Sequence, residues 1–263
     1  MGKRTSNRKS KKHAELEFVD QAQGIVIDLN SYSQQPRPYR NPPRRIQAKT
    51  QAQGHYMAAI RKHQLTFGLG PAGTGKSYCA AAMAAEALEN ERVDRIVFTR
   101  PAVEADESLG FLPGNLLEKF DPYFDAFRDC LVQLLGKGVV ECALKNGRIV
   151  LSPLGFLRGK TFTRSFVVLD EAQNCSVGQL KLFLTRIGEE CRVVVNGDTR
   201  QSDIGADSGL RDAVDRLRGL PDVYIHEFNR NDVVRSALVR GILERYEDDF
   251  DRAAPSVRPY PAT

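Results

Sequence analysis

The sequence has no tryptophan, no closely spaced cysteine pair and no long hydrophobic run. A membrane-spanning helix needs about 20 consecutive apolar residues, and no stretch approaches that length, so no membrane partner is predicted. The polar, basic N-terminus lacks the apolar core of a signal peptide. The five cysteines are scattered without a C-x-x-C pair, which argues against a zinc site and against a disulfide framework. We therefore expect a reducing, cytoplasmic location.

Positive charge is concentrated at one end of the chain. Residues 1–50 hold eleven Lys and Arg against four Asp and Glu, whereas residues 51–263 carry a net charge of −2. Residues 1–12 are basic without apolar periodicity, which is typical of a disordered arm. Such an arm either attracts nucleic-acid phosphates without sequence preference or only keeps the protein soluble. The composition leaves both interpretations open.

Proline marks the predicted boundaries of the compact region. Residues 31–50 contain four prolines among arginines, which excludes helix and sheet there, and residues 251–263 contain three more. We therefore predict a basic, largely disordered arm and linker over residues 1–50, with a small strand element at residues 16–29. A compact domain over residues 51–250 and a tail over residues 251–263 follow.

Within the compact domain, short apolar segments alternate with helix-favouring ones. This alternation predicts a single α/β core in which helices cover both faces of a parallel sheet. A helix predicted over residues 115–135 contains Pro122, which should kink or split it, and residues 139–150 fit either a short helix or a strand. The strands are predicted at residues 65–67, 93–99, 166–170, 192–196 and 223–226, and the other helices at residues 51–63, 76–88, 178–187, 208–217 and 232–246.

A glycine-rich loop follows the first of these strands. Residues 70–77 read GPAGTGKS and match G-x-x-x-x-G-K-[ST], the phosphate-binding P-loop, in its required place between a strand and a helix. The backbone N–H groups of such a loop surround a polyphosphate at the positive end of the helix. Lys76 is predicted to contact the β and γ phosphates and the Ser77 hydroxyl to hold Mg²⁺. The predicted nucleotide-binding residues are Gly70, Pro71, Ala72, Gly73, Thr74, Gly75, Lys76 and Ser77.

Two adjacent acids end the strand FVVL at residues 166–169. The carboxyl ends of parallel strands are where α/β sheets bind their ligands, so Asp170 is predicted to join Ser77 in holding Mg²⁺. Glu171 is the natural general base for a water that attacks the γ-phosphate. An acid in this position favours hydrolysis over phosphoryl transfer to a small molecule, which argues against a P-loop kinase.

A third strand ends in the polar sequence NGDTRQ at residues 196–201. We predict that Gln201 senses the γ-phosphate and reports hydrolysis to the substrate site. The G-D-x-x-Q pattern is weak by itself, and its order and spacing after the acid pair strengthen it.

Together these motifs resemble the PhoH family of ATPases, which is related to the core of superfamily 1 helicases. The resemblance covers about Gln53 to Tyr246 and implies a single RecA-like P-loop NTPase core that uses ATP and Mg²⁺. The family pattern usually has glycine where this chain has Asp106, and threonine where it has Ser77. The resemblance rests on GPAGTGKS, on RPAVEADESLGFLPGNLLEKFDPY at residues 100–123, and on FLRGKTF, FVVLDEAQN, NGDTRQSD and NDVVRSALV.

The resemblance implies further roles for particular residues. Gln53 resembles the glutamine that reads adenine, which would select ATP over GTP. Arg100 lies where related helicases contact a nucleic-acid strand or couple it to the nucleotide; the alternative is a salt-bridged arginine at a strand end. Arg158 and Lys160 are similar candidates for phosphate contact.

We therefore predict an Mg²⁺-dependent ATPase acting on single-stranded nucleic acid, with RNA favoured over DNA by the resemblance alone. The alternative is a nucleotide-gated regulatory or scaffold protein that switches a protein partner. About 200 compact residues leave room for one core domain, so an arginine finger would have to come from a neighbouring copy in a closed ring. Resemblance to ring-forming motors favours a hexamer, with Arg235 as the first candidate finger and Arg230 as the second.

Overall fold

The computed structural model describes the backbone of residues 17–20, 25–28, 47–101, 116–157, 159, 161–234 and 239. The chain divides into two compact units, Met1–Arg44 and Arg45–Thr263. In the first unit β1 (Glu17–Asp20) pairs antiparallel with β2 (Ile25–Asp28). The predicted domain boundary at residue 50 stays a prediction.

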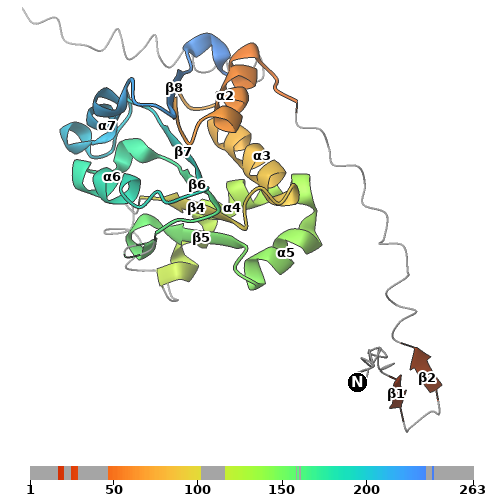
Figure 1. The fold of residues 1–263 in the computed structure, drawn as a ribbon. Coiled ribbons are helices and arrows are strands. Elements are labelled where there is room, and N and C mark those ends of the chain that lie inside the picture. The colour runs from red at the N-terminus through yellow and green to blue at the C-terminus, as the bar shows by residue number, and fades with distance from the viewer. Residues whose placement is uncertain are drawn as a thin grey trace, which may run out of the picture. The chain divides into compact units, whose positions relative to one another are not determined.

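A six-stranded sheet forms the centre of the larger unit, and each of its strands runs parallel to its neighbours (Figure 1). The spatial order β5-β4-β6-β7-β3-β8 places β7 between the strand that precedes the P-loop and the strand that precedes the acid pair. The strands are β3 (Leu65–Leu69), β4 (Arg95–Arg100), β5 (Ile149–Pro153), β6 (Ser165–Leu169), β7 (Arg192–Gly197) and β8 (Val223–Glu227). The predicted parallel α/β fold is confirmed.

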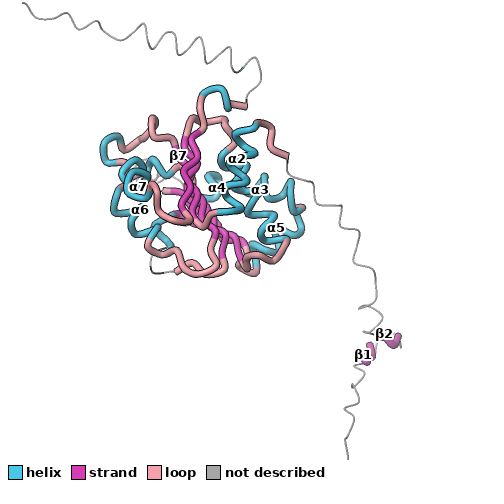
Figure 2. The backbone as a smooth tube through the Cα atoms, turned by 45° about the horizontal axis from the view of Figure 1, so that its top comes forward, coloured by secondary structure: helices cyan, strands magenta, loops and turns pink. Residues whose placement is uncertain are grey.

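Helices cover both faces of this sheet, as Figure 2 shows with the strands seen between two helical layers. One layer contains α2 (Gln51–Lys62), α3 (Lys76–Glu89), α4 (Leu116–Leu135) and α5 (Lys137–Lys145), and the other contains α6 (Val177–Leu184) and α7 (Leu210–Leu217). Short 3-10 turns connect the elements: η2 (Leu154–Leu157), η3 (Ala172–Asn174), η4 (Gly205–Asp207) and η5 (Arg230–Asp232). No helix in the described ranges is both long and apolar enough to cross a membrane.

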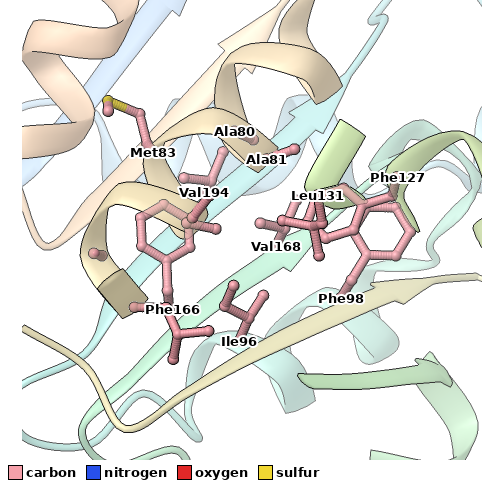
Figure 3. Packing of buried hydrophobic residues seen from close by; sticks show 14 of the residues in the cluster. Ala80, Ala81, Met83, Ile96, Phe98, Phe127, Leu131, Phe166, Val168 and Val194 are labelled. Carbon is pink, nitrogen blue, oxygen red and sulfur yellow. The ribbon is translucent and has the colours of Figure 1, made fainter. Parts of the chain in front are cut away.

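The central strands are apolar on both faces because each face packs against helices. Alternate side chains of β6 enter different clusters: Phe166 and Val168 face α3 and α4, whereas Val167 and Leu169 face the other layer. Figure 3 shows the first cluster, in which the rings of Phe98 and Phe127 are stacked with their centroids 3.9 Å apart. This double-sided core holds the carboxyl ends of the strands rigid.

The structure answers two questions that the sequence left open, one about Pro122 and one about residues 139–150. α4 is not split at Pro122, because it runs as one helix from Leu116 to Leu135. The burial of Phe124, Phe127 and Leu131 offsets the hydrogen bond that the proline removes. Residues 139–150 contain the end of α5 and the start of β5. The last predicted helix, residues 232–246, falls mostly outside the described residues.

Phe98→Ala should lower the free energy of unfolding by about 3–5 kcal/mol, because it leaves a cavity under α4. Phe98 is 2% exposed and contacts the rings of both Phe124 and Phe127. Urea unfolding followed by circular dichroism measures the change. Phe156→Ala is the matched control, since Phe156 is 48% exposed and should change stability by about 0.5 kcal/mol at most. Equal losses in the two variants would contradict the assignment of the core.

Candidate active site

The P-loop backbone can be built only with glycine at particular positions. Gly70, Gly73 and Gly75 have φ angles of +135°, +84° and +84°, a region that other L-residues rarely adopt. A Cβ at Gly70 would also lie 2.5 Å from the carbonyl oxygen of Phe228. The loop that connects β3 to α3 therefore has the curvature that a phosphate-binding turn requires.

Side chains at the start of α3 connect this loop to the end of β6. The Lys76 Nζ donates hydrogen bonds to the carbonyl oxygens of Gly70 (2.5 Å) and Pro71 (2.9 Å). The Ser77 Oγ donates to the Asp170 Oδ1 at 2.9 Å. The two residues predicted to hold Mg²⁺ are therefore side by side. A hydroxyl and a carboxylate are oxygen ligands of the kind Mg²⁺ takes from proteins, so the residues present fit the ion.

Burial controls the protonation of the two central charges. It raises the pKa of the Asp170 carboxyl, an effect that the Arg100 guanidinium opposes and Glu171 reinforces. It also lowers the pKa of the Lys76 ammonium, against the attraction of the neighbouring acids Asp170, Asp198 and Glu171. Both groups are thus in a site where charge is costly without an ionic partner.

Glu171 has an unusual backbone conformation and a firmly held side chain. Its φ of 55° and ψ of 41° place it in the left-handed region, at a cost of about 1–2 kcal/mol for a residue with a Cβ. The Arg100 Nη2 donates to Oε1 at 2.8 Å, and the Gln173 Nε2 donates to Oε2 at 2.7 Å. The side chain is 47% exposed, whereas that of Asp170 is 7% exposed. One acid is therefore buried beside Ser77, and its neighbour faces solvent.

Gln173 is a site residue that the sequence predictions missed. Its Oε1 accepts a hydrogen bond from the Asp198 backbone N at 3.1 Å, while its Nε2 holds Glu171. Its backbone carbonyl accepts a hydrogen bond from the Ser202 Oγ at 3.0 Å. Gln173 thus joins the turn after β6 to the turn after β7. The sequence feature that could have identified Gln173 as a site residue is its position at the end of D-E-A-Q.

These residues surround a cavity of about 240 Å³ at the carboxyl edge of the sheet. The structure brings together Lys76, Ser77, Asp170, Glu171 and Gln201, as the motifs predicted, and Gln201 lies exposed. The full lining is Ala72, Gly73, Gly75, Lys76, Ser77, Tyr78, Asp170, Glu171, Gln173, Gly197, Asp198 and Gln201. The cavity therefore combines the P-loop, both acids and the predicted sensor.

Gln53 lies against the P-loop from the side of α2. It is 3% exposed, its Nε2 donates to the Thr74 carbonyl at 3.0 Å, and its Oε1 accepts from the Lys49 backbone N at 2.8 Å. A Cβ at Gly75 would be 2.6 Å from the Gln53 Nε2. The structure thus places Gln53 in contact with the loop, and its reading of adenine stays a prediction.

The predicted arginine and lysine contacts have different outcomes. Arg100 forms the strand-end salt bridge given as its alternative, with its Nη2 2.8 Å from Glu171 Oε1 and 3.6 Å from Asp170 Oδ2. Its contact with nucleic acid stays a prediction. Arg230 lies in η5 and lines a groove that also includes Gly70. The remaining predicted contacts, Arg158, Lys160 and Arg235, lie outside the described residues.

Comparison with known proteins identifies the family. The family model for PhoH-like proteins matches residues 45–247. The chain belongs to the PhoH family. It is 45% identical over 204 residues to a PhoH-like protein of Bacillus subtilis (strain 168), and 47% identical over 205 residues to Protein PhoH of Escherichia coli (strain K12). These alignments cover 77% and 76% of this chain but 64% and 58% of the relatives, so the chain spans about three fifths of their length.

Two solved helicase structures are distant neighbours of this PhoH-family chain. The UvsW helicase from bacteriophage T4 aligns with a TM-score of 0.45 at 11% identity, covering 71% of this chain and 62% of that one. The Pif1 helicase from Candida albicans aligns with a TM-score of 0.41 at 11% identity, covering 82% and 50%. The predicted family is confirmed by its model and relatives, and the structure shows the predicted single core with a parallel sheet.

Lys76→Ala should weaken the binding of a fluorescent ATP analogue about 10- to 100-fold, because a hydrogen bond from a charged donor contributes about 1.5–3 kcal/mol. Fluorescence titration measures the dissociation constant. Lys62→Ala removes an exposed lysine from the end of α2 and should bind as tightly as the unmodified protein. Unchanged affinity in a folded Lys76→Ala variant would contradict the assignment of the phosphate site.

Proposed function

We propose that this PhoH-family protein is an Mg²⁺-dependent ATPase that works on single-stranded nucleic acid in the cytoplasm. The observation that supports hydrolysis is the meeting of Lys76, Ser77, Asp170 and Glu171 around one cavity. A P-loop alone is compatible with many nucleotide-binding proteins. A second acid, with both carboxylate oxygens oriented at the cavity wall, supplies the group that a hydrolase additionally needs.

Each residue has one task in this proposal. When nucleotide binds, Lys76 would give up its hydrogen bonds to the two loop carbonyls and donate to phosphate oxygens instead. Ser77 and Asp170 would hold Mg²⁺, which neutralises charge on the phosphates when it is bound. Glu171 accepts a proton from the attacking water as the water oxygen bonds to the γ-phosphorus and the bond to the β-phosphate oxygen breaks. Gln173 and Arg100 keep the Glu171 carboxylate in place before the water is bound.

Coupling to nucleic acid is supported by the position of Arg100 and by the charge of the N-terminal region. Arg100 contacts the proposed base directly, at 2.8 Å, so any strand that binds this guanidinium acts on the catalytic carboxylate. Residues 1–50 hold an excess of seven positive charges, which would add affinity for phosphates. The choice of RNA over DNA rests on the resemblance of this chain to its family.

Glu171→Gln should retain ATP-analogue binding and lose turnover about 10²- to 10⁴-fold, because an amide cannot accept the proton of the attacking water. Phosphate release measures turnover, and fluorescence titration measures binding. Glu89→Gln, at the exposed end of α3, is the matched control and should behave as the unmodified protein. Similar turnover in the unmodified protein and Glu171→Gln would remove the proposed base.

The same assay with single-stranded RNA or single-stranded DNA added tests the substrate of the unmodified protein. Faster turnover with either strand supports the nucleic-acid motor, and a larger effect of RNA supports the proposed preference. Hydrolysis that is indifferent to both strands would overturn the coupling and favour the alternative, a nucleotide-gated ATPase that switches a protein partner. Glu171→Gln measured in parallel gives the background that does not come from this site.

The proposal includes a homo-oligomeric ring, with a hexamer expected. An arginine finger contributes roughly 10³–10⁵ in rate where it acts, and in this proposal a neighbouring copy supplies it to the core domain. Arg235 is the proposed finger from the neighbouring copy. Arg235→Ala should stay assembled and bind ATP while losing turnover. Arg216→Ala, which removes an exposed arginine of α7 paired with Asp212, should retain turnover.

Light scattering measures the assembly of both variants. Mixtures of Arg235→Ala and Glu171→Gln subunits should recover part of the activity, because an intact site can form across a mixed interface. A fully active monomer would contradict the ring.

A further inference from the structure

Helix α2 is connected to the metal-binding acid by buried polar side chains. Tyr56 is 0% exposed, and its hydroxyl donates a hydrogen bond to the Asn196 Oδ1 at 2.5 Å. Asn196, also 0% exposed, is the residue before the last of β7. The Asn196 side chain favours the charged form of the Asp170 carboxyl and so lowers its pKa, and its buried amide nitrogen has no hydrogen-bond partner among the described residues. Asp170 therefore interacts with both Ser77 and Asn196.

A glycine in the middle of the sheet makes room for this connection. The parallel register places Gly68 of β3 beside Asn196 of β7. A Cβ at Gly68 would lie 2.5 Å from the Tyr56 hydroxyl oxygen and 2.7 Å from the Asn196 Oδ1. Glycine weakens a strand interior and often marks a close approach of another group. The close approach here is that of the tyrosine hydroxyl.

The tyrosine ring is fixed from the side opposite to its hydroxyl. Its centroid lies 5.2 Å from that of Phe228, edge to face, and 5.3 Å from that of His226. Burial raises the pKa of Tyr56 well above its usual value, so the hydroxyl keeps its proton and needs an acceptor. Asn196 Oδ1 is that acceptor, and the amide nitrogen of Asn196 is then the group left facing Asp170.

We propose that Tyr56 is a positioning residue for Mg²⁺ binding, because its hydroxyl sets which end of the Asn196 amide faces Asp170. With the amide reversed, the Asn196 oxygen would face the carboxylate and repel it, and Tyr56 would lose its acceptor. Three residues earlier on α2, Gln53 holds the P-loop through the Thr74 carbonyl. One helix thus fixes both the phosphate loop and the acid. The inference rests on the proposed Mg²⁺-ATP site and adds a residue that lies outside its motifs.

Tyr56→Phe removes the hydroxyl and keeps the ring. The affinity for a non-hydrolysable fluorescent ATP analogue is measured in EDTA and over a series of Mg²⁺ concentrations. The affinity in EDTA should be unchanged, while the Mg²⁺ concentration for half-maximal binding should rise about 3- to 10-fold, the effect of one hydrogen bond. Tyr224→Phe is the matched control, since Tyr224 lies on β8 and is 37% exposed, and it should leave both quantities unchanged.

The pairing of Tyr56 with Asn196 is tested by a double-mutant cycle. Asn196→Ala should raise the Mg²⁺ requirement as Tyr56→Phe does, and the double variant should add little to Asn196→Ala alone, because both act through one amide. Additive effects, an unchanged Mg²⁺ requirement in folded Tyr56→Phe, or an equal loss of affinity in EDTA and in Mg²⁺ would each overturn the proposal. A failure of the proposed function would give another result. In that case the unmodified protein would bind Mg²⁺ and the analogue but would not hydrolyse ATP.

Discussion

The hydrogen bond between Ser77 and Asp170 joins the two halves of the site, and its geometry depends on the whole sheet. The two residues follow β3 and β6, which are separated by β7. Parallel pairing sets Leu69 beside Gly197 and Leu169 beside Val195, so the turns after all three strands emerge at one edge. A 2.9 Å contact between side chains 93 positions apart follows from that register. The P-loop and the acid pair would otherwise remain separate motifs.

Backbone strain and tight packing are concentrated at this edge, and the core stabilises them. The backbone of Glu171 is in the left-handed region, and there is no room for a Cβ at Gly70. Gly68 leaves space within β3 for the Tyr56 hydroxyl. The strands beneath are buried on both faces. Burial of this kind contributes about 25 cal/mol per Å² of apolar surface, which is large compared with a few strained residues at about 1–3 kcal/mol each. Rigid strand ends thus hold an arrangement that the turns alone would not adopt.

The sequence predicted local features well and long-range contacts poorly, for a physical reason. The P-loop, the strand before Asp170 and the alternation of strands and helices are set by neighbouring residues, and they were predicted. The sequence left open whether Pro122 kinks α4 or splits it, because the continuity of this helix depends on tertiary burial rather than on helix propensity. The roles of Gln173 and Tyr56 depend on partners 25 and 140 positions away. The motifs mark where these residues lie in the sequence, but which side chains meet is decided by the fold.

Arg100 is the residue at which hydrolysis and a nucleic-acid strand would meet under the proposed function. Its guanidinium holds the Glu171 carboxylate, lies 3.6 Å from Asp170 and donates to the Tyr123 carbonyl at 3.1 Å. A nucleic-acid phosphate that binds Arg100 competes for the same donors. Strand binding at Arg100 would therefore change how the Glu171 carboxylate is held, which gives it a direct physical route to the rate of hydrolysis.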